Sequence, residues 1–249
     1  MSHSRFYIPE SDWNPEALVL VDDEAHHCRD VMRLEPGSRL TVFNGAGKEA
    51  ETEISAASRD RIELRPLVFN ESAPLPARIT LGQAIPKGKN MDLIVQKATE
   101  LGAAEIIPLL SERTIVQIDP IDLEKKRQKW QRVAIEACKQ CGQNWLPTVG
   151  EPISVDRFVE AKRPGVQVIG AIEPSARPFD AILADYLETN PERPDSATVM
   201  VGPEGDFTPA EMAKAFSAGF APWSLGPIVL RSETAAIYTL SVLAYELMR

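Results

Sequence analysis

The feature that most constrains the fold lies near the carboxyl terminus, where a strand, a glycine loop and a helix occur twice in succession. The first unit comprises the β-branched run 199–201, the loop Gly202-Pro203-Glu204-Gly205, and a capping box with proline at the first helical position, Thr208-Pro209-Ala210-Glu211. Residues 223–232 repeat this order in outline, and a last, mostly apolar helix follows. Glycine loops at the carboxyl ends of two strands predict a ligand site in an open α/β sheet.

The two loops carry no phosphate-binding signature, because neither G-x-x-x-x-G-K-[ST] nor G-x-G-x-x-G occurs in this region. Pro203 and Pro227 stiffen the loops, while the glycines leave backbone N–H and C=O groups accessible. Such a surface suits a flat neutral base such as adenine better than a pyrophosphate. The alternative is that these glycine–proline turns are only connections between strands and helices.

The rest of the chain indicates two domains. Strands are predicted at 79–85, 106–110 and 166–172, and helices at 91–101, 122–141 and 178–187. This alternation predicts a mostly parallel sheet. The earlier part is β-rich instead, with strands at 39–43, 49–54 and 61–64 and a hairpin turn at 44–47. The segment 71–77 contains two prolines and resembles a linker, so we expect domains at 1–73 and 74–249.

Charge is unevenly distributed along the chain. The formal net charge is −9, yet residues 74–150 hold 11 Lys and Arg against 8 Asp and Glu. Phosphate contacts require a local basic patch and not a basic chain, so a nucleic-acid partner remains compatible with this composition. The alternative is that the basic run 125–132 is only the solvated face of a helix.

Other classes of protein are disfavoured. No apolar stretch follows a basic start and no apolar run is long enough to span a bilayer, so we expect a cytoplasmic protein without a membrane segment. The three cysteines fit no zinc-ligand spacing with the three histidines, so we expect no metal site. Cys138 and Cys141 form C-x-x-C inside a helical pattern, which favours packing over a redox role.

A series of motifs, in order along nearly the whole chain, resembles one family. GPEGDF at 202–207 and LGPIVLRSETA at 225–235 resemble the two C-terminal motifs of the SPOUT class of methyltransferases. The block KGKNMDLIVQKATELG at 87–102 resembles the K-G-x-x-M-D-x-x-V-Q-K-x-T-E-L-G pattern of the members that methylate N3 of a uridine in 16S ribosomal RNA. Residues 5–7, 111–113 and 132–140 fit the same family.

The resemblance implies an α/β fold, with a C-terminal α/β trefoil-knot (SPOUT) domain and a smaller N-terminal PUA-like or OB-like β-barrel domain that binds RNA. In this class the last helix passes through a loop of the chain, and the knot forms the contact of a homodimer beside the cofactor site. General topological rules would exclude a knot. This expectation therefore rests on the resemblance alone.

The resemblance also implies S-adenosylmethionine as methyl donor, and Arg231 matches the arginine of the family's LR-[ST]-E-T-A motif. A cation near a uridine carbonyl oxygen would stabilise the negative charge that develops when N3 loses its proton. Glu204 or Glu233 is a candidate acceptor for that proton, although either is alternatively a helix cap or an ion-pair partner of Arg231. The expected cofactor residues, acting mainly through backbone groups, are Gly202, Gly205, Leu225, Gly226, Ile228 and Leu230.

The implied partner is the 16S rRNA of the small ribosomal subunit. The candidate RNA-binding residues are Arg5, Arg29, Arg33, Lys87, Lys89, Lys97, Arg113 and Lys139. Asp206 departs from the family pattern, which often has glycine there, but aspartate tolerates left-handed backbone. Ser232 replaces a common threonine and keeps the hydroxyl. Two alternatives stay open: another SPOUT RNA methyltransferase, acting on tRNA or a ribose 2′-hydroxyl, and a non-catalytic RNA-binding ribosome factor.

Overall fold

The structure is a computed structural model that describes residues 4–88, 90–113 and 120–249. Its contacts divide the chain into two units. The first consists of Met1–Pro74 together with Ile135–Leu146, and the second of Leu75–Ala134 together with Pro147–Arg249. A twelve-residue segment from far along the chain thus belongs with the N-terminal part, which the expected boundary after residue 73 did not include.

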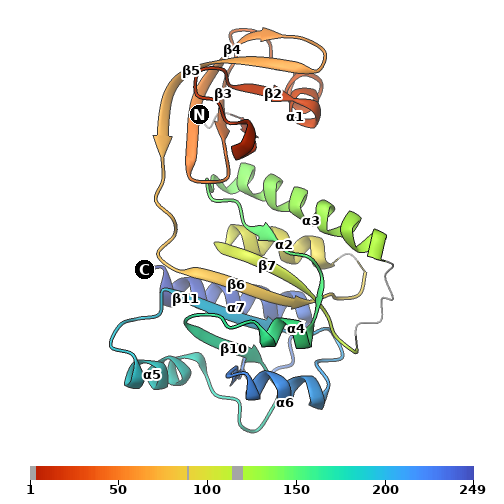
Figure 1. Cartoon of the computed structure of the whole chain (residues 1–249), viewed down its shortest axis with the longest axis vertical. Helices are drawn as coiled ribbons and strands as arrows, with labels where there is room; N and C mark the ends of the chain where they lie inside the picture. Colours follow the sequence, from red (N-terminus) through yellow and green to blue (C-terminus); the bar gives the residue numbers. More distant parts are fainter. Residues whose placement is uncertain (1–3, 89, 114–119) are drawn as a thin grey trace. The chain divides into compact units, whose positions relative to one another are not determined.

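The first unit is built on one five-stranded sheet (Figure 1). Its strands are β1 (Arg5–Tyr7), β2 (Val19–Val21), β3 (Arg39–Phe43), β4 (Lys48–Ala57) and β5 (Arg61–Glu71). They pair in the order β1-β3-β4-β5-β2, and the short helix α1 (Asp22–His26) follows β2. The predicted hairpin between β3 and β4 is confirmed, because Asn44 Oδ1 accepts the amides of Ala46 and Lys48 at 2.9 and 3.0 Å. Closure of this sheet into a barrel stays a prediction.

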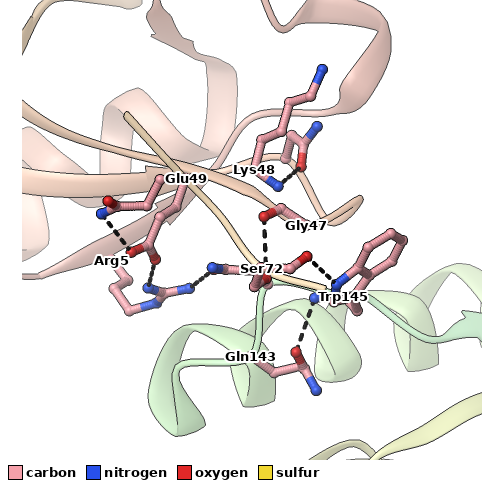
Figure 2. Close-up of polar contacts among 10 residues, drawn as sticks. Arg5, Gly47, Lys48, Glu49, Ser72, Gln143 and Trp145 are labelled. Atoms are coloured by element: carbon pink, nitrogen blue, oxygen red, sulfur yellow. Dashed lines mark hydrogen bonds and ion pairs between the residues drawn. The ribbon is translucent and has the colours of Figure 1, made fainter. Parts of the chain in front are cut away.

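Residues 143–146 are anchored to this sheet by the polar contacts that Figure 2 shows. The Arg5 guanidinium donates to Glu49 at 2.8 Å and to Asn144 Oδ1 at 2.6 Å. The indole N–H of Trp145 donates to the carbonyls of Ser72 and Ala73, both at 3.0 Å. These contacts attach the segment that follows a helix ending at Cys141 to the sheet of the first unit.

The second unit contains a seven-stranded sheet with the order β12-β10-β11-β6-β7-β8, and β9 also pairs with β7. The recorded pairings in it are parallel, as predicted. Its strands are β6 (Arg78–Ala84), β7 (Ala103–Leu110), β8 (Thr148–Val149), β9 (Ile153–Ser154), β10 (Val166–Gly170), β11 (Ser196–Val201) and β12 (Ala221–Trp223). Because the strands are parallel, the loops that follow β10, β11 and β12 meet at one edge of the sheet.

Helices cover this sheet in two groups (Figure 1). The helices that follow β6 in the chain are α2 (Asn90–Glu100), α3 (Pro120–Cys141), α4 (Val155–Glu160), α5 (Phe179–Thr189), α6 (Pro209–Ser217) and α7 (Ser232–Leu247). Helices α2 and α7 pack against each other, while α4 and α6 pack together with Met200 and Ile169 of the sheet. The predicted capping box of α6 is confirmed, because Thr208 Oγ1 accepts the Glu211 amide and the Glu211 carboxylate accepts the Thr208 amide.

Candidate functional site

A cavity of about 400 Å³ lies at the carboxyl edge of the parallel sheet. The loops after β10, β11 and β12 and the start of α7 form its walls. Its lining residues are 170–174, 201–204, 206, 224–230, 232 and 235. This volume lies within the range of roughly 300–1,000 Å³ that is typical of small-molecule sites. The structure therefore contains a cavity at the place where the two glycine loops predicted a ligand site.

The first loop is closed tightly around Gly202. A Cβ at Gly202 would lie 2.9 Å from Asp206 Oδ1, so a side chain there would displace the loop. Asp206 has φ of 60°, and its carboxylate accepts the Phe207 amide at 2.8 Å. The expectation that aspartate takes left-handed backbone at this position is confirmed.

The second loop depends on Gly226 and exposes two apolar side chains. Gly226 has φ of +104°, a conformation that side-chain-bearing residues rarely adopt. Ile228 and Val229 are each 74% exposed, and Ile172 in the loop after β10 is 72% exposed. Apolar side chains this exposed at a cavity rim are typical of a surface that a ligand or a second chain covers.

Most of the predicted cofactor residues line the cavity. Gly202, Leu225, Gly226, Ile228 and Leu230 are in its walls. Gly205 does not line it, and its carbonyl instead accepts the Arg113 guanidinium at 2.6 Å. The cofactor role of these residues stays a prediction.

The three candidate catalytic residues lie around the same edge. Glu204 lines the cavity and its carboxylate accepts the Lys87 amide at 3.1 and 3.3 Å. Glu233, in the first turn of α7, accepts from Asn90 Nδ2 at 3.3 Å. Arg231 is the exposed N-cap residue of α7, and within the described part of the chain its guanidinium forms no hydrogen bond or ion pair. The ion pair considered as an alternative for Arg231 is thus not formed with Glu204 or Glu233.

The predicted RNA-binding residues occupy different environments. Arg33 and Lys87 are exposed, Lys97 forms an ion pair with Glu100 at 2.7 Å, and Lys89 lies outside the described residues. Arg113 is bound to loop carbonyls, and its guanidinium also reaches the Phe207 carbonyl at 3.4 Å.

Three further basic candidates have protein partners within the first unit. The Lys139 side chain is only 7% exposed and is paired with Glu24 and with Glu136. The Arg5 side chain is 13% exposed and forms the hydrogen bonds with Glu49 and Asn144 described above. Arg29 donates to the Asp30 carboxylate and holds the pKa of that group down to about 2. These contacts make Lys139 and Arg5 poor phosphate ligands, because each cation is largely shielded from solvent and already has a carboxylate partner.

The loop after β10 was not predicted from the sequence. The predicted strand ran to Ile172, whereas β10 ends at Gly170 and residues 170–174 line the cavity. Gly170 and Pro174 flank that segment, and this pair is the local signal that marks a loop instead of a longer strand.

No helix among the described residues has the length and apolar character that crossing a membrane requires. Within the same residues, no group of three or more His, Cys, Asp or Glu side chains is arranged to hold a metal ion.

Comparison with known families assigns both parts of the chain. Residues 73–244 match the RNA methyltransferase domain family, and residues 20–67 match the RNA methyltransferase PUA domain family. The ribosomal RNA small subunit methyltransferase E of Bacillus subtilis is 30% identical over 228 residues, 91% of this chain and 89% of that protein. The protein of the same name from Synechocystis is 33% identical, over 90% of this chain and 71% of that protein.

Two solved structures have the same fold over nearly their whole length. A methyltransferase from Legionella pneumophila, in complex with the cofactor SAM, superposes with a TM-score of 0.88 at 35% identity, covering 99% of this chain and 98% of that one. The ribosomal RNA small subunit methyltransferase E from Neisseria gonorrhoeae, bound to S-adenosyl methionine, gives 0.85 at 31% identity, covering 98% of each chain. The chain therefore belongs to the RNA methyltransferase family that includes the ribosomal RNA small subunit methyltransferase E proteins.

Proposed function

We propose that this protein transfers a methyl group from S-adenosylmethionine to N3 of a specific uridine in the 16S rRNA of the small ribosomal subunit. The observation that carries the proposal is the cavity between the loops after β10, β11 and β12, with Arg231, which has no partner among the described residues, at the adjacent start of α7. The names and bound cofactor of the relatives support the same donor and the same class of RNA.

The residues around the cavity fit this cofactor. The cavity has the volume of a small-molecule site, and Gly202 and Gly226 bring backbone groups to its wall. We expect those groups to bind the adenosine part, with Leu225, Ile228 and Leu230 as apolar walls. When bound, S-adenosylmethionine supplies an electrophilic methyl group on a sulfonium. The contribution of the protein is then mainly to hold donor and acceptor in line.

Arg231 acts on the acceptor base. Its guanidinium stabilises the negative charge that spreads to a uridine carbonyl oxygen as N3 loses its proton. Glu204 or Glu233 receives that proton, directly or through water. Glu204 already lines the cavity, which favours it over Glu233.

We divide the chain into an RNA-binding domain at 1–73 and a methyltransferase domain at 74–249. Exposed cations of both domains hold the RNA. Arg33 and Lys87 are exposed and remain candidates, together with Lys89, Lys97 and Arg113. The ion pairs of Lys139 and Arg5, both side chains that are mostly shielded from solvent, give them a structural role within the first unit instead.

We further propose that the second unit has the trefoil knot of its class, that the N-terminal sheet closes as a barrel, and that two chains form a homodimer in the cytoplasm. The exposed apolar side chains of Ile172, Ile228 and Val229 beside the cavity support a dimer contact there. Burying them against a second chain would remove apolar surface from water and complete the rim of the cavity.

Two measurements separate this function from its alternatives. Calorimetric titration with S-adenosylmethionine tests the cavity, and a radiolabelled methyl donor tests transfer to small subunits, large subunits and tRNA side by side. The proposal expects binding and label in small-subunit RNA only. Label in tRNA would favour another SPOUT activity, and the absence of cofactor binding would favour a non-catalytic RNA-binding factor.

A further inference from the structure

Gln83 is a buried polar residue next to the cavity that does not line it. It is the second-last residue of β6, it pairs with Val201 of β11, and its side chain is fully buried. Glutamine is rarely buried without hydrogen bonds, because an unpaired amide loses its bonds to water. The contacts of this side chain therefore indicate what it does.

The Gln83 amide begins a short chain of hydrogen bonds that reaches the cavity wall. Its Nε2 donates to Ser232 Oγ at 2.9 Å and to the Ala84 carbonyl at 2.8 Å. The Ser232 hydroxyl then donates to the Gly202 carbonyl at 2.7 Å. A serine hydroxyl has one hydrogen, so the direction is fixed: amide to hydroxyl, and hydroxyl to carbonyl.

These hydrogen bonds connect two parts of the cavity wall, the loop after β11 and the start of α7. Gly202 opens the first loop, and Ser232 is the first residue of α7; both line the cavity. Ser232 also stands between Arg231 and Glu233, two of the candidate catalytic residues. A shift of the Ser232 hydroxyl would therefore move both the loop and the start of the helix.

The other end of the amide shows that Gln83 is not the best residue for packing alone. Its Oε1 is buried and has no hydrogen-bond partner among the described residues. An unpaired buried acceptor destabilises a fold, and a methionine of similar size would not carry that acceptor. The role of this buried amide therefore lies in the groups that its N–H donors bind, the Ser232 hydroxyl and the Ala84 carbonyl.

We propose that Gln83 is a positioning residue of the methyltransferase site, which holds Ser232 and, through it, the Gly202 carbonyl in the geometry that cofactor binding requires. This inference rests on the proposed function, because the measured ligand is S-adenosylmethionine.

A double-mutant cycle on the S-adenosylmethionine dissociation constant tests the proposal. Gln83→Met removes the first hydrogen bond of the chain and Ser232→Ala removes both, and we expect each variant to raise Kd roughly tenfold, as the loss of a buried hydrogen bond to the cavity wall would. The double variant should also raise Kd roughly tenfold, because the two residues act through the same bonds. Independent effects, with a rise of roughly a hundredfold in the double variant, would overturn the proposal. So would an unchanged Kd in Gln83→Met.

Thr99→Val is the matched control. Thr99 is also buried, and its hydroxyl donates to the Val95 carbonyl at 2.9 Å within α2, away from the cavity lining. This variant should lower Tm and leave the cofactor Kd unchanged. An increase in Kd equal to that of Gln83→Met would mean that the effect is general loosening, which contradicts a positioning role.

Gln83→Glu adds a second measurement, the pH dependence of the cofactor Kd, which a change in side-chain packing would not alter. A protonated carboxyl keeps one donor for Ser232, whereas a carboxylate has none. The ratio of variant to wild-type Kd should therefore rise with pH, and a flat ratio would contradict the proposal. Together with Ser232→Ala, this variant decides the question if Gln83→Met does not fold. Failure of the wild-type protein to bind S-adenosylmethionine would instead refute the proposed function.

Discussion

Arg231 is the residue on which the proposed chemistry most depends. Among the described residues its guanidinium has no partner, whereas Arg113 is bound to loop carbonyls and Lys139 to carboxylates. A free cation beside a ligand cavity is available to stabilise charge that develops during a reaction. The sequence identified Arg231 by its motif, but only the contacts distinguish it from the other basic residues.

Arg231→Ala should retain S-adenosylmethionine binding and lose most of its turnover. Removal of a group that stabilises transition-state charge typically lowers kcat by roughly 10²–10³-fold. Calorimetry and single-turnover methyl transfer measure the two effects separately. Arg157→Ala is the control, because Arg157 is an exposed arginine on α4, away from the cavity. Retained turnover in Arg231→Ala would remove this residue from the mechanism.

The cysteines differ sharply in their expected reactivity. Burial raises the pKa of the Cys138 thiol to about 12, with the nearby Cys141 adding to the effect, and burial likewise raises that of Cys28 to about 11. Cys141 is exposed. Because only the thiolate reacts, a raised pKa means less thiolate and slower modification at a given pH.

At pH 8, we therefore expect a disulfide reagent to modify one thiol of the native protein, Cys141, and all three after denaturation. Spectrophotometric titration with such a reagent gives both counts. Rapid native modification of Cys138 would contradict its burial and would revive the redox alternative for the C-x-x-C pair.

At the scale of elements, Glu211 joins two segments that are distant in sequence. Its carboxylate closes the capping box of α6 and also accepts the Glu112 amide at 2.9 Å, just after β7. The side chain is 4% exposed. The capping box is a local pattern and was predictable, whereas the bond to Glu112 depends on strand order and was not.

Glu211→Gln should destabilise the protein by about 1–3 kcal/mol, because the amide can accept from only one of the two N–H groups that Glu211 now satisfies. Thermal unfolding should show a Tm lower by several degrees, at roughly 2–4 °C for each kcal/mol in a chain of this size. The exposed Glu188 of α5 provides the control, Glu188→Gln, with no expected shift. An equal Tm for both variants would show that the second of these two hydrogen bonds adds no stability.

Local signals predicted most of the long strands and helices, and the misses have physical causes. The strand predicted at 61–64 extends to Glu71 as β5, because a register shift beside Pro66 lets the sheet continue past a residue that cannot donate. The two-residue strands β8 and β9 were not predicted, since they exist only through pairing with β7, and the short helix α4 was also not predicted. Likewise, the side chains that attach residues 135–146 to the first unit carry no local pattern.

At the scale of the whole molecule, the exposed apolar rim of the cavity is the feature that sequence periodicity could not identify. Ile172, Ile228 and Val229 lie in loops, where no alternation separates an interface residue from a core residue. The family resemblance supplied the dimer and the knot, and both remain proposals. The composition of the chain predicted neither.

Val229→Glu should convert the proposed homodimer to a monomer, because it places a charge in the apolar contact. Sedimentation velocity at several protein concentrations measures the change. Leu187→Glu is the control, since Leu187 is an exposed apolar residue of α5 that does not line the cavity. A wild-type protein that sediments as a monomer at all concentrations would rule out the dimer.

In the proposed reaction, N3 of one uridine in 16S rRNA receives the methyl group. Small ribosomal subunits from cells that lack this methylation should be incubated with the protein and labelled S-adenosylmethionine, and their rRNA digested to nucleosides for mass spectrometry. We expect label in 3-methyluridine at one 16S rRNA site, lost in Arg231→Ala. Label in another nucleoside, or none from an enzyme that binds the cofactor, would contradict it.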